Sequence, residues 1–339
     1  MLTGRKAFAI GLAFAAAHVG ILCAGFFAPY ASGEQHREYA YAPPTRLHFV
    51  DAEHHIHLLP FIYQSTPVEG DGFQYGESHN SKYPIHFLIR KQDGLHLLAV
   101  DAPANLFLLG TDGYGRDIFS RLLFGGRTSL LAAGAATLLT LLIGATLGGI
   151  AGQFGGPIDT VIMRGAELVL ALPWVYLLLA IRASLPLHVD PTNTLILLSA
   201  VIGVMGWARP ARLIRGVVLS AKQRPFVTAA RGFGASEWYL LRRHVLPQAL
   251  GIIAAQAVIL IPQFVAAEAT LSFLGLGVGE PVPSWGNMLS AFQQIQTVSS
   301  YWWMATPLVG LIAVSLTYFA LADALHQKES GMRSGERYA

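Results

Sequence analysis

The chain has 339 residues, of which 53% are hydrophobic and only 13% are charged, and its formal net charge is +3. This composition is too apolar and too weakly charged for an ordinary soluble domain, so it indicates a polytopic membrane protein. The basic residues flank apolar runs and do not alternate with exposed aromatic residues, which argues against nucleic-acid binding.

Six apolar windows are long enough to predict membrane-spanning helices, since a span needs roughly 20 residues at about 1.5 Å rise each. They are residues 7–28, 129–152, 161–183, 194–208, 250–274 and 302–325. The fourth window is short unless its helix continues into the polar sequence that follows it. The predicted fold class is therefore an all-α polytopic membrane protein with six transmembrane helices.

The N-terminal window follows Arg5 and Lys6 and resembles a signal peptide. It is about as long as a full span and ends at Pro29 without a clear small-x-small cleavage site. We therefore expect residues 1–30 to be an uncleaved transmembrane anchor, with a cleaved leader as the alternative. The single cysteine, Cys23, lies inside this window, so no intrachain disulfide is expected.

Residues 31–107 are predicted to form a β-rich extracytoplasmic insertion. Nearly a hundred residues without structure would be unusual, and this stretch contains short runs rich in β-branched and aromatic residues. Asp93 and Gly94 separate two such runs, residues 85–90 and 95–100, and this dipeptide is a strong hairpin signal.

The insertion contains three histidines, His54, His55 and His57, beside Asp51 and Glu53. Imidazole and carboxylate groups can bind zinc or nickel. Side chains alternate along a strand, so His55 and His57 would share a face that His54 would not, and no second cluster follows at a recognised spacing. We expect structural or solvated histidines here and no metal site.

A polar turn with Asp112, Arg116 and Asp117 precedes an apolar helical face at residues 118–124. This pattern predicts a short helix in the membrane interface. The turn is a candidate for docking a partner, but exposed turns often hold local ion pairs, which favours a simple pairing of Arg116 with Asp117.

Polar residues inside the apolar windows are costly in a bilayer and usually face other helices or a water-filled path. Arg164 and Glu167 are three residues apart, so we expect them to neutralise each other. In the fifth window, Gln256, Gln263 and Glu268 are candidate pathway residues. Interhelical hydrogen bonding is an equally weighted alternative for these three.

Residues 209–247, called the basic segment below, contain eight of the 23 Lys and Arg residues. Positive charge in short loops collects on the cytoplasmic side, so this segment predicts cytoplasmic N- and C-termini. Pro225 suits the first turn of a helix, Gly234 suits the residue that ends it, and Ser236 suits the cap of a second helix. Pro247 is expected to break or restart the chain before the next span. Such a helix pair suits either a partner's groove or the lipid surface.

The sequence TAARGFGASEWYLLRRHVLP in the basic segment resembles the EAA loop of permease subunits of binding-protein-dependent ABC importers. Thr228 stands where the family usually has Glu, and His244 where the general motif has Ile. Residues 108–131 and 267–289 are similar to the corresponding segments of C-type permeases of dipeptide, oligopeptide and nickel importers. The coupling-loop positions implied by the resemblance are Thr228, Ala229, Ala230, Gly234, Ala235, Leu246 and Pro247.

The resemblance covers the chain apart from residues 31–107 and implies a type I ABC importer permease fold. It implies a permease core at 108–325, which contains the coupling loop, and a cytoplasmic tail at 326–339. The implied partners are a second permease in a heterodimer, two cytoplasmic ABC ATPases, an extracytoplasmic substrate-binding protein and the lipid bilayer of a bacterial-type inner membrane.

The resemblance makes peptides the expected solute, with nickel or another small solute as the alternative. A different class remains open: a membrane-anchored sensor or interaction protein whose insertion binds a ligand. The sequence has no HExxH, GxSxG or GxxxxGK[ST] motif, so we expect no catalytic residue and no cofactor. The ATP site of such an importer is expected on separate subunits.

Overall fold

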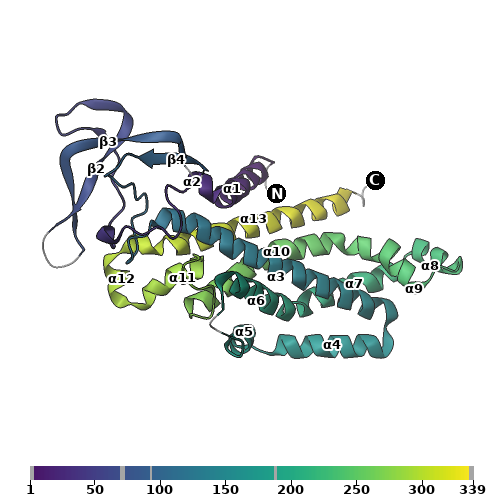
Figure 1. Ribbon diagram of the computed structural model, residues 1–339. Helices are drawn as coiled ribbons and strands as arrows, with labels where there is room; N and C mark the ends of the chain where they lie inside the picture. The colour runs from purple at the N-terminus through teal and green to yellow at the C-terminus, as the bar shows by residue number, and fades with distance from the viewer. Residues whose placement is uncertain (1–3, 69–72, 92–93, 187–188, 336–339) are drawn as a thin grey trace. The chain divides into compact units, whose positions relative to one another are not determined.

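The computed structural model describes residues 4–68, 73–91, 94–186 and 189–335, and the chain divides into two compact units. The first unit consists mainly of Leu130–Leu271 with the two ends of the chain. The second unit combines Phe14–Ser129 with Ser272–Ala313. Figure 1 labels the elements of both units.

The first unit is helical. Short breaks separate α4 from α5 and α6 from α7. Three helices, α3, α10 and α13, extend into residues that belong to the second unit. The elements are α3 (Ile118–Phe154), α4 (Gly156–Ala171), α5 (Trp174–Ala183), α6 (Pro191–Met205), α7 (Ala208–Lys222), α8 (Pro225–Gly232), α9 (Glu237–Leu240), the π-helix η2 (Leu241–Val245), the 3₁₀-helix η3 (Leu246–Ala249), α10 (Leu250–Phe273) and α13 (Thr306–Gly335).

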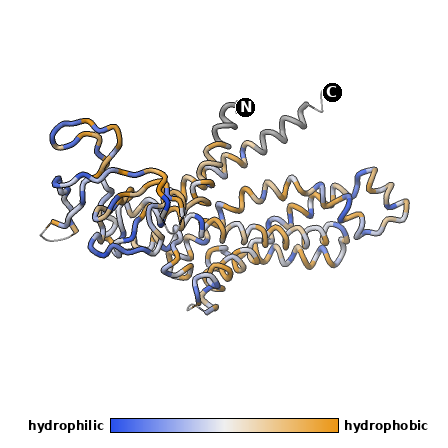
Figure 2. Tube along the Cα trace, turned by 45° about the horizontal axis from the view of Figure 1, so that its top comes forward, coloured by the Kyte–Doolittle hydropathy of each residue, from blue (hydrophilic) through white to orange (hydrophobic). Residues whose placement is uncertain are grey.

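Within the described residues, three helical segments are long and apolar enough to cross a membrane, namely Ile118–Phe154, Glu237–Phe273 and Trp302–Ala324. Two bent pairs raise the count of candidate spans to five if each pair is one span: α4 with α5, and α6 with α7. The N-terminal window contains two shorter helices, α1 (Gly4–Leu22) and α2 (Ala24–Phe27). In Figure 2 the long helices are mostly coloured as hydrophobic, as lipid-facing or packed helices require.

Three boundaries differ from the expectations. The window at 161–183 is not one straight helix, because α4 and α5 meet at 91° beside Pro173, which lacks an N–H and ends regular helix pairing. The window at 194–208 extends into α7 at an angle of 46°, so the first part of the basic segment is helix and not loop. Residues 118–124 are not a separate interfacial helix but the first turns of α3.

Small residues let the helices of the first unit approach closely. An ideal Cβ on Gly148 of α3 would lie 2.3 Å from the Ala211 carbonyl oxygen of α7. A Cβ on Gly203 of α6 would lie 2.9 Å from the Ala136 carbonyl oxygen of α3. The Thr140 hydroxyl donates a 2.8 Å hydrogen bond to the Gly203 carbonyl. Small residues and interhelical hydrogen bonds of this kind hold helices together in a bilayer, where burial of apolar surface adds little.

The second unit contains an antiparallel sheet of four strands in the order β1-β2-β3-β4, at residues where strands were expected. The strands are β1 (His48–Val50), β2 (Ile56–Pro67), β3 (Tyr75–Lys91) and β4 (Gly94–Val100). Lys91 pairs with Gly94 across the β3–β4 connection. The predicted turn residue Asp93 lies outside the described residues, but the antiparallel pairing of β3 with β4 agrees with the hairpin signal.

The core of the sheet region is small. It is formed by Ile62, Ile85, Ala104 and Leu106, which are all buried. The end of α2 is tied to β4, because His96 Nδ1 lies 2.8 Å from the Ala28 carbonyl oxygen. Further along, the short helix α11 (Trp285–Leu289) begins with a capping box, in which Ser284 and Asn287 satisfy each other's backbone N–H. The remaining short elements are η1 (Arg37–Tyr39), η4 (Ser290–Gln293), α12 (Ile295–Ser300) and η5 (Trp302–Ala305).

Candidate functional site

The second half of the basic segment folds as two short helices and a tight turn. Helix α8 begins at Pro225, and Gly234 follows its C-terminal end with φ of +87°, a conformation that glycine adopts without strain. Ser236 caps α9, because its hydroxyl oxygen accepts a 3.3 Å hydrogen bond from the Tyr239 N–H. Glu237 occupies the first turn of α9, where the helix dipole favours a carboxylate. The local prediction for this stretch is confirmed.

Of the two outcomes expected at Pro247, a break or a restart, the structure shows a restart. Pro247 lies in the first turn of η3, which follows η2 directly and leads into α10, and Glu237–Phe273 counts as one continuous helical segment. Proline removes one backbone donor, and a local change to π and 3₁₀ hydrogen bonding lets the helix pass through it. Helix α9 therefore continues into α10 without an intervening loop, and the turn at residues 233–236 connects α8 to α9.

An apolar cluster lies beneath α8 and α9. It fixes the helix pair on α7, because the buried side chains come from all of these elements. The cluster consists of Ile214, Val218, Ala221, Val227, Leu240, Leu241, Val245 and Ala249. Each of these side chains is nearly or fully excluded from solvent, so the pair is a packed part of the first unit and not a loose loop.

A polar network also fixes the turn. Arg231 donates to Glu237 through Nε and Nη2, at 2.7 and 3.1 Å. Glu237 also accepts a hydrogen bond from the Gln153 side chain at the end of α3. Lys222 Nζ lies 2.5 Å from the Gln153 carbonyl oxygen. The hydrogen bond to Glu237 raises the pKa of Arg231, so this guanidinium stays charged.

The residues that the resemblance singles out divide into two groups by exposure. The exposed residues are Thr228, Ala229, Gly234 and Pro247. The half-buried ones are Ala230, Ala235 and Leu246, and all three pack against the apolar cluster. Phe233 has 93% of its surface exposed, and Phe226 and Trp238 in the same segment are exposed as well, at 46% and 51%. An aromatic side chain this exposed, flanked by small residues, is typical of a contact surface.

The three candidate pathway residues do not share one environment. Gln256 and Glu268 are buried, whereas Gln263 is exposed. Gln263 lines a cavity of about 210 Å³ within the first unit. The predicted pair of Arg164 and Glu167 is confirmed, with Nη1 2.7 Å from Oε2 and both side chains exposed.

The polar turn of the second unit is buried and not exposed. The exposed fractions are 6% for Asp112, 7% for Arg116 and 2% for Asp117. Arg116 does not pair with Asp117. It donates to Asp112 Oδ2 at 2.7 Å and to both carboxylate oxygens of Glu280, at 2.6 and 3.1 Å. Arg121 also donates to Glu280 Oε1, at 2.9 Å. Asp112, Arg116, Arg121 and Glu280 are called the polar cluster below.

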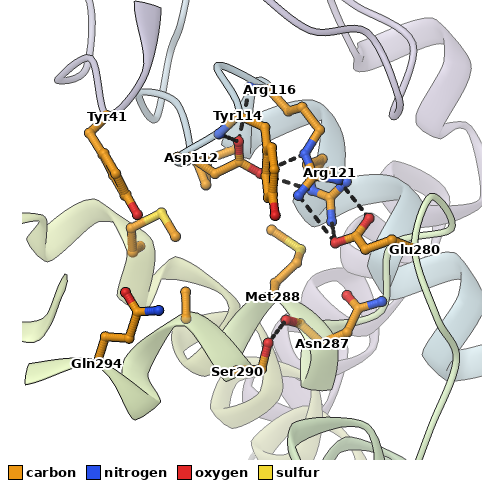
Figure 3. Close-up of a pocket in the computed structure, with 14 residues that line it drawn as sticks. Tyr41, Asp112, Tyr114, Arg116, Arg121, Glu280, Asn287, Met288, Ser290 and Gln294 are labelled. Carbon is orange, nitrogen blue, oxygen red and sulfur yellow. Dashed lines mark hydrogen bonds and ion pairs between the residues drawn. The ribbon is translucent and has the colours of Figure 1, made fainter. Parts of the chain in front are cut away.

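The polar cluster borders a cavity of about 490 Å³ in the second unit. Figure 3 shows Arg116, Arg121 and Glu280 on one side of this cavity, with Tyr41 and Gln294 opposite. Burial lowers the pKa of Arg116, but the Asp112 and Glu280 carboxylates outweigh burial and leave this pKa raised. The two arginines and two carboxylates balance in charge, which allows Asp112, Arg116 and Arg121 to be buried.

Asp117 has a separate role as the cap of α3. Its Oδ2 accepts from the N–H and the hydroxyl of Ser120, at 2.8 and 2.6 Å. Its other oxygen, Oδ1, is buried without a hydrogen-bond partner among the described residues. Burial raises the pKa of Asp117 to about 6, and the hydrogen bonds from Ser120 oppose this rise only partly.

The histidines near Asp51 are arranged differently from the expectation. Only His57 lies in β2, whereas His54 and His55 lie in the turn before it. Asp51, Glu53 and His55 offer atoms within 4.8 Å of one another, the spacing of a possible metal site. However, Asp51 Oδ2 already binds Lys82 Nζ at 2.5 Å and His57 Nε2 at 2.9 Å. These hydrogen bonds, Lys82 first, hold the pKa of Asp51 well below its usual range, so its carboxylate stays ionised beside the ammonium group.

Sequence reasoning missed several functional candidates, among them Arg121 and Gln153. Glu280 was missed although a signal was present, since it is the only charged residue between Glu268 and Asp323. A lone charge in so long an uncharged stretch indicates a specific partner.

Comparison with known proteins adds independent information. A family model described as "Binding-protein-dependent transport system inner membrane component" matches residues 144–331, which include the whole basic segment. The dipeptide transport system permease protein of Bacillus subtilis (strain 168) is 37% identical over 227 residues, covering 65% of this chain and 68% of that protein. The oligopeptide transport system permease protein of the same organism is 35% identical over 239 residues, covering 69% and 76%.

A relative from a second organism is similar to this chain to the same degree. The oligopeptide transport system permease protein of Escherichia coli (strain K12) is 35% identical over 225 residues, covering 65% of this chain and 72% of that protein. Among solved structures, a chain of the MetNI methionine ABC transporter aligns with a TM-score of 0.43 and 20% identity, over 61% of this chain and 95% of that chain.

Proposed function

Because the chain belongs to the family of binding-protein-dependent transport system inner membrane components, we propose that it is a permease subunit of an ATP-driven ABC importer of peptides. The observation that carries the proposal is the identity of at least 35% to dipeptide and oligopeptide permeases over about two thirds of the chain. Permease subunits of ABC transporters have no ATPase site of their own, so this subunit is not an enzyme.

The proposed topology has six spans, with α1 and α2 as the first and both termini in the cytoplasm. The basic segment supports this orientation, because residues 276–300, which would then lie outside, contain no Lys or Arg. The sheet of β1 to β4 would form an extracytoplasmic insertion between the first two spans. This arrangement puts α8 and α9 on the cytoplasmic side.

The second half of the basic segment, formed by α8, α9 and the turn between them, is the proposed contact with the ATPases. Thr228, Ala229 and Gly234 would face the ATPase surface, with Phe233 as the apolar anchor. The apolar cluster and the pair of Arg231 with Glu237 support this role, because they make the turn rigid enough to transmit a displacement of the ATPases. The continuous helical path through η2 and η3 into α10 would transmit that displacement into the membrane. Ala230, Ala235, Leu246 and Pro247 would hold the geometry of the turn.

The proposed complex contains a second, similar permease, two cytoplasmic ATPases and an extracytoplasmic binding protein. Closure of the ATPases on ATP would shift the permease pair between outward-facing and inward-facing states, according to the difference in affinity for the two states. Asp112, Arg116 and Asp117 would hold the outer end of α3 in position, and this role does not require direct contact with the binding protein. Gln256 and Glu268 would hold helices together by hydrogen bonds.

A reconstituted complex provides the direct test. The chain would be purified with its second permease and ATPases, placed in proteoliposomes and supplied with its binding protein. We expect ATP-dependent uptake of labelled di- and oligopeptides. Uptake of nickel but not peptides would support the nickel alternative. Failure of the chain to copurify with any ATPase would instead favour the sensor class.

A further inference from the structure

Two helix breaks in the first unit lie at one cavity. The cavity of about 210 Å³ is bordered by Leu172, at the break between α4 and α5, and by Gly206, at the break between α6 and α7. Within a bilayer, interrupted helical backbone is tolerated where it is buried in protein or lines a water-filled space. Two independent breaks that border the same cavity therefore indicate a place where polar contents are accommodated.

The cavity lies beside the middle of α10 and at the starts of α5 and α7. Gln263 is ten residues from the end of α10 at Phe273, or about 15 Å at 1.5 Å per residue. This distance is about half of a hydrocarbon core of roughly 30 Å. Trp174 is the first residue of α5, at the 91° break after α4. If α10 crosses the bilayer, the Gln263 side of the cavity lies near its middle.

The lining is apolar with two polar side chains. The rings of Trp174 and Phe264 stack with centroids 5.9 Å apart and planes at 17°. Gln263 and Arg209 are the polar members, and both are exposed. An apolar wall with few polar groups is the usual composition of a ligand site.

Arg209 is one of several arginines of its unit that have no carboxylate partner among the described residues, and it is the one that lines this cavity. By contrast, Arg164, Arg215 and Arg231 each pair with a carboxylate at 2.5 to 2.7 Å. Among the residues that the structure describes, no carboxylate is recorded within 4.0 Å of Arg209. This arginine also lies in the first turn of α7, whose N-terminal end adds partial positive charge. The cavity thus offers a guanidinium group and a helix N-terminus to an anion, and a planar guanidinium binds a carboxylate by two parallel hydrogen bonds.

We propose that this cavity, called the Arg209 cavity, binds the C-terminal residue of a peptide in transit. The free carboxylate binds Arg209, the side chain packs against Trp174 and Phe264, and the Gln263 amide hydrogen-bonds the peptide main chain. The volume fits about one residue, since pockets for larger ligands run from roughly 300 to 1,000 Å³. This inference rests on the proposed peptide-import function and gives it a substrate contact within this subunit.

Direct binding to the complete complex tests the inference. The permease pair with its ATPases would be placed in lipid nanodiscs without binding protein or nucleotide, so that selection by the binding protein does not intervene. The probes are labelled alanyl-phenylalanine and its C-terminal amide. We expect the wild-type complex to bind the free acid about tenfold more tightly than the amide, because a hydrogen-bonded charge pair adds about this factor to the affinity.

Three variants separate the roles. Arg209→Gln is expected to bind the acid and the amide equally, at the level of the amide. Gln263→Leu is expected to weaken both ligands to the same extent, because it removes a contact with the main chain and not with the carboxylate. Arg164→Gln removes an exposed arginine of the same unit that does not line the cavity, and it is expected to behave as wild type.

The result that overturns the inference is a preference for the acid that survives in Arg209→Gln. Equal binding of acid and amide by the wild type would also overturn it, as would the lack of saturable binding in a complex that imports the dipeptide. Failure of the proposed function is a different outcome, in which the wild-type complex with its binding protein imports no peptide at all. If the complex imports peptide but Arg209→Gln still prefers the free acid over the amide, only the role assigned to the Arg209 cavity is contradicted.

Discussion

Arg116 and Glu280 are 164 positions apart in the sequence, yet their side chains form a two-pronged ion pair with N–O distances of 2.6 and 3.1 Å. The pair joins the turn before α3 to the segment before α11, both within the second unit. Arg121 binds the same carboxylate, so one exposed acidic side chain compensates two buried arginines. Asp112 is the second carboxylate of the cluster, at 2.7 Å from Arg116 Nε.

Glu280→Gln is expected to destabilise the second unit. The substitution leaves Arg116 and Arg121 buried with Asp112 as the only nearby carboxylate. Breaking a fully buried pair costs roughly 3–5 kcal/mol. The Glu280 side chain is 47% exposed, so solvent screening reduces the expected loss to about 2 kcal/mol of unfolding free energy. Unfolding of the purified protein in detergent, followed by circular dichroism, measures this change.

Glu53→Gln is the matched control for Glu280→Gln. Glu53 lies in the same unit with a side chain that is 76% exposed, and it does not belong to the polar cluster. We expect no measurable loss of stability in this variant. Equal stability of Glu280→Gln and Glu53→Gln would contradict the role assigned to Glu280.

Gly234→Ala is expected to impair coupling of ATP hydrolysis to transport. An ideal Cβ at this position meets no atom within 4 Å, so its effect comes from the positive φ alone, at a cost of about 1 kcal/mol or more. Gly234→Asp adds a charge at the proposed interface and is expected to reduce uptake further. Peptide uptake per ATP hydrolysed in proteoliposomes is the measurement.

Gly232→Ala provides the comparison for Gly234→Ala. Gly232 is two residues away in α8, has no positive φ and also has no atom within 4 Å of an added Cβ. Alanine favours a helix over glycine, so this variant is expected to couple normally. If both substitutions reduce coupling equally, the left-handed turn is not what matters.

Phe233→Ser is expected to weaken association with the ATPases and to leave the fold intact. Phe233 is 93% exposed, so its removal costs the isolated subunit little. Loss of an aromatic anchor from an interface typically costs about 2 kcal/mol, or about thirtyfold in affinity. Titration of the purified ATPase onto permease in nanodiscs measures the affinity. Ile295→Ser, at a position that is 85% exposed in α12, should bind the ATPase normally.

Asp117→Asn is expected to flatten the pH dependence of stability. The folded-state pKa of about 6 lies above the usual value near 3.9, so the unfolded chain loses this proton first as the pH rises. The stabilising contribution is therefore complete below about pH 4 and is lost as the pH passes 6, a change of about 3 kcal/mol. Thermal unfolding midpoints at pH 5.0 and 7.5 should differ less in Asp117→Asn than in wild type. An identical pH dependence in the two proteins would refute this assignment.

The local chemistry of the basic segment was predictable from the sequence. The start of α8 at Pro225, the positive φ of Gly234 and the Ser236 cap depend on residues within one or two turns of each other. The pairing of Arg164 with Glu167 was predictable for the same reason, since residues three apart on a helix are neighbours.

The continuity of the helix through Pro247 was not predictable, because it depends on how neighbouring turns adjust their hydrogen bonds. The same holds for the polar turn. The local pair of Arg116 with Asp117 was the natural expectation, but Asp117 caps α3 and Arg116 reaches Glu280. Sequence separation alone gives no sign of such a contact.

The sequence by itself determined the class of this protein, its apolar windows and the position of the basic segment, because hydropathy and charge are sums over local residues. Only the tertiary structure decided which helices bend, which polar residues are buried and that Arg209 and Gln263, 54 positions apart, line one cavity. These features arise from packing between segments far apart in the chain, where each side chain's environment is set by its neighbours in space.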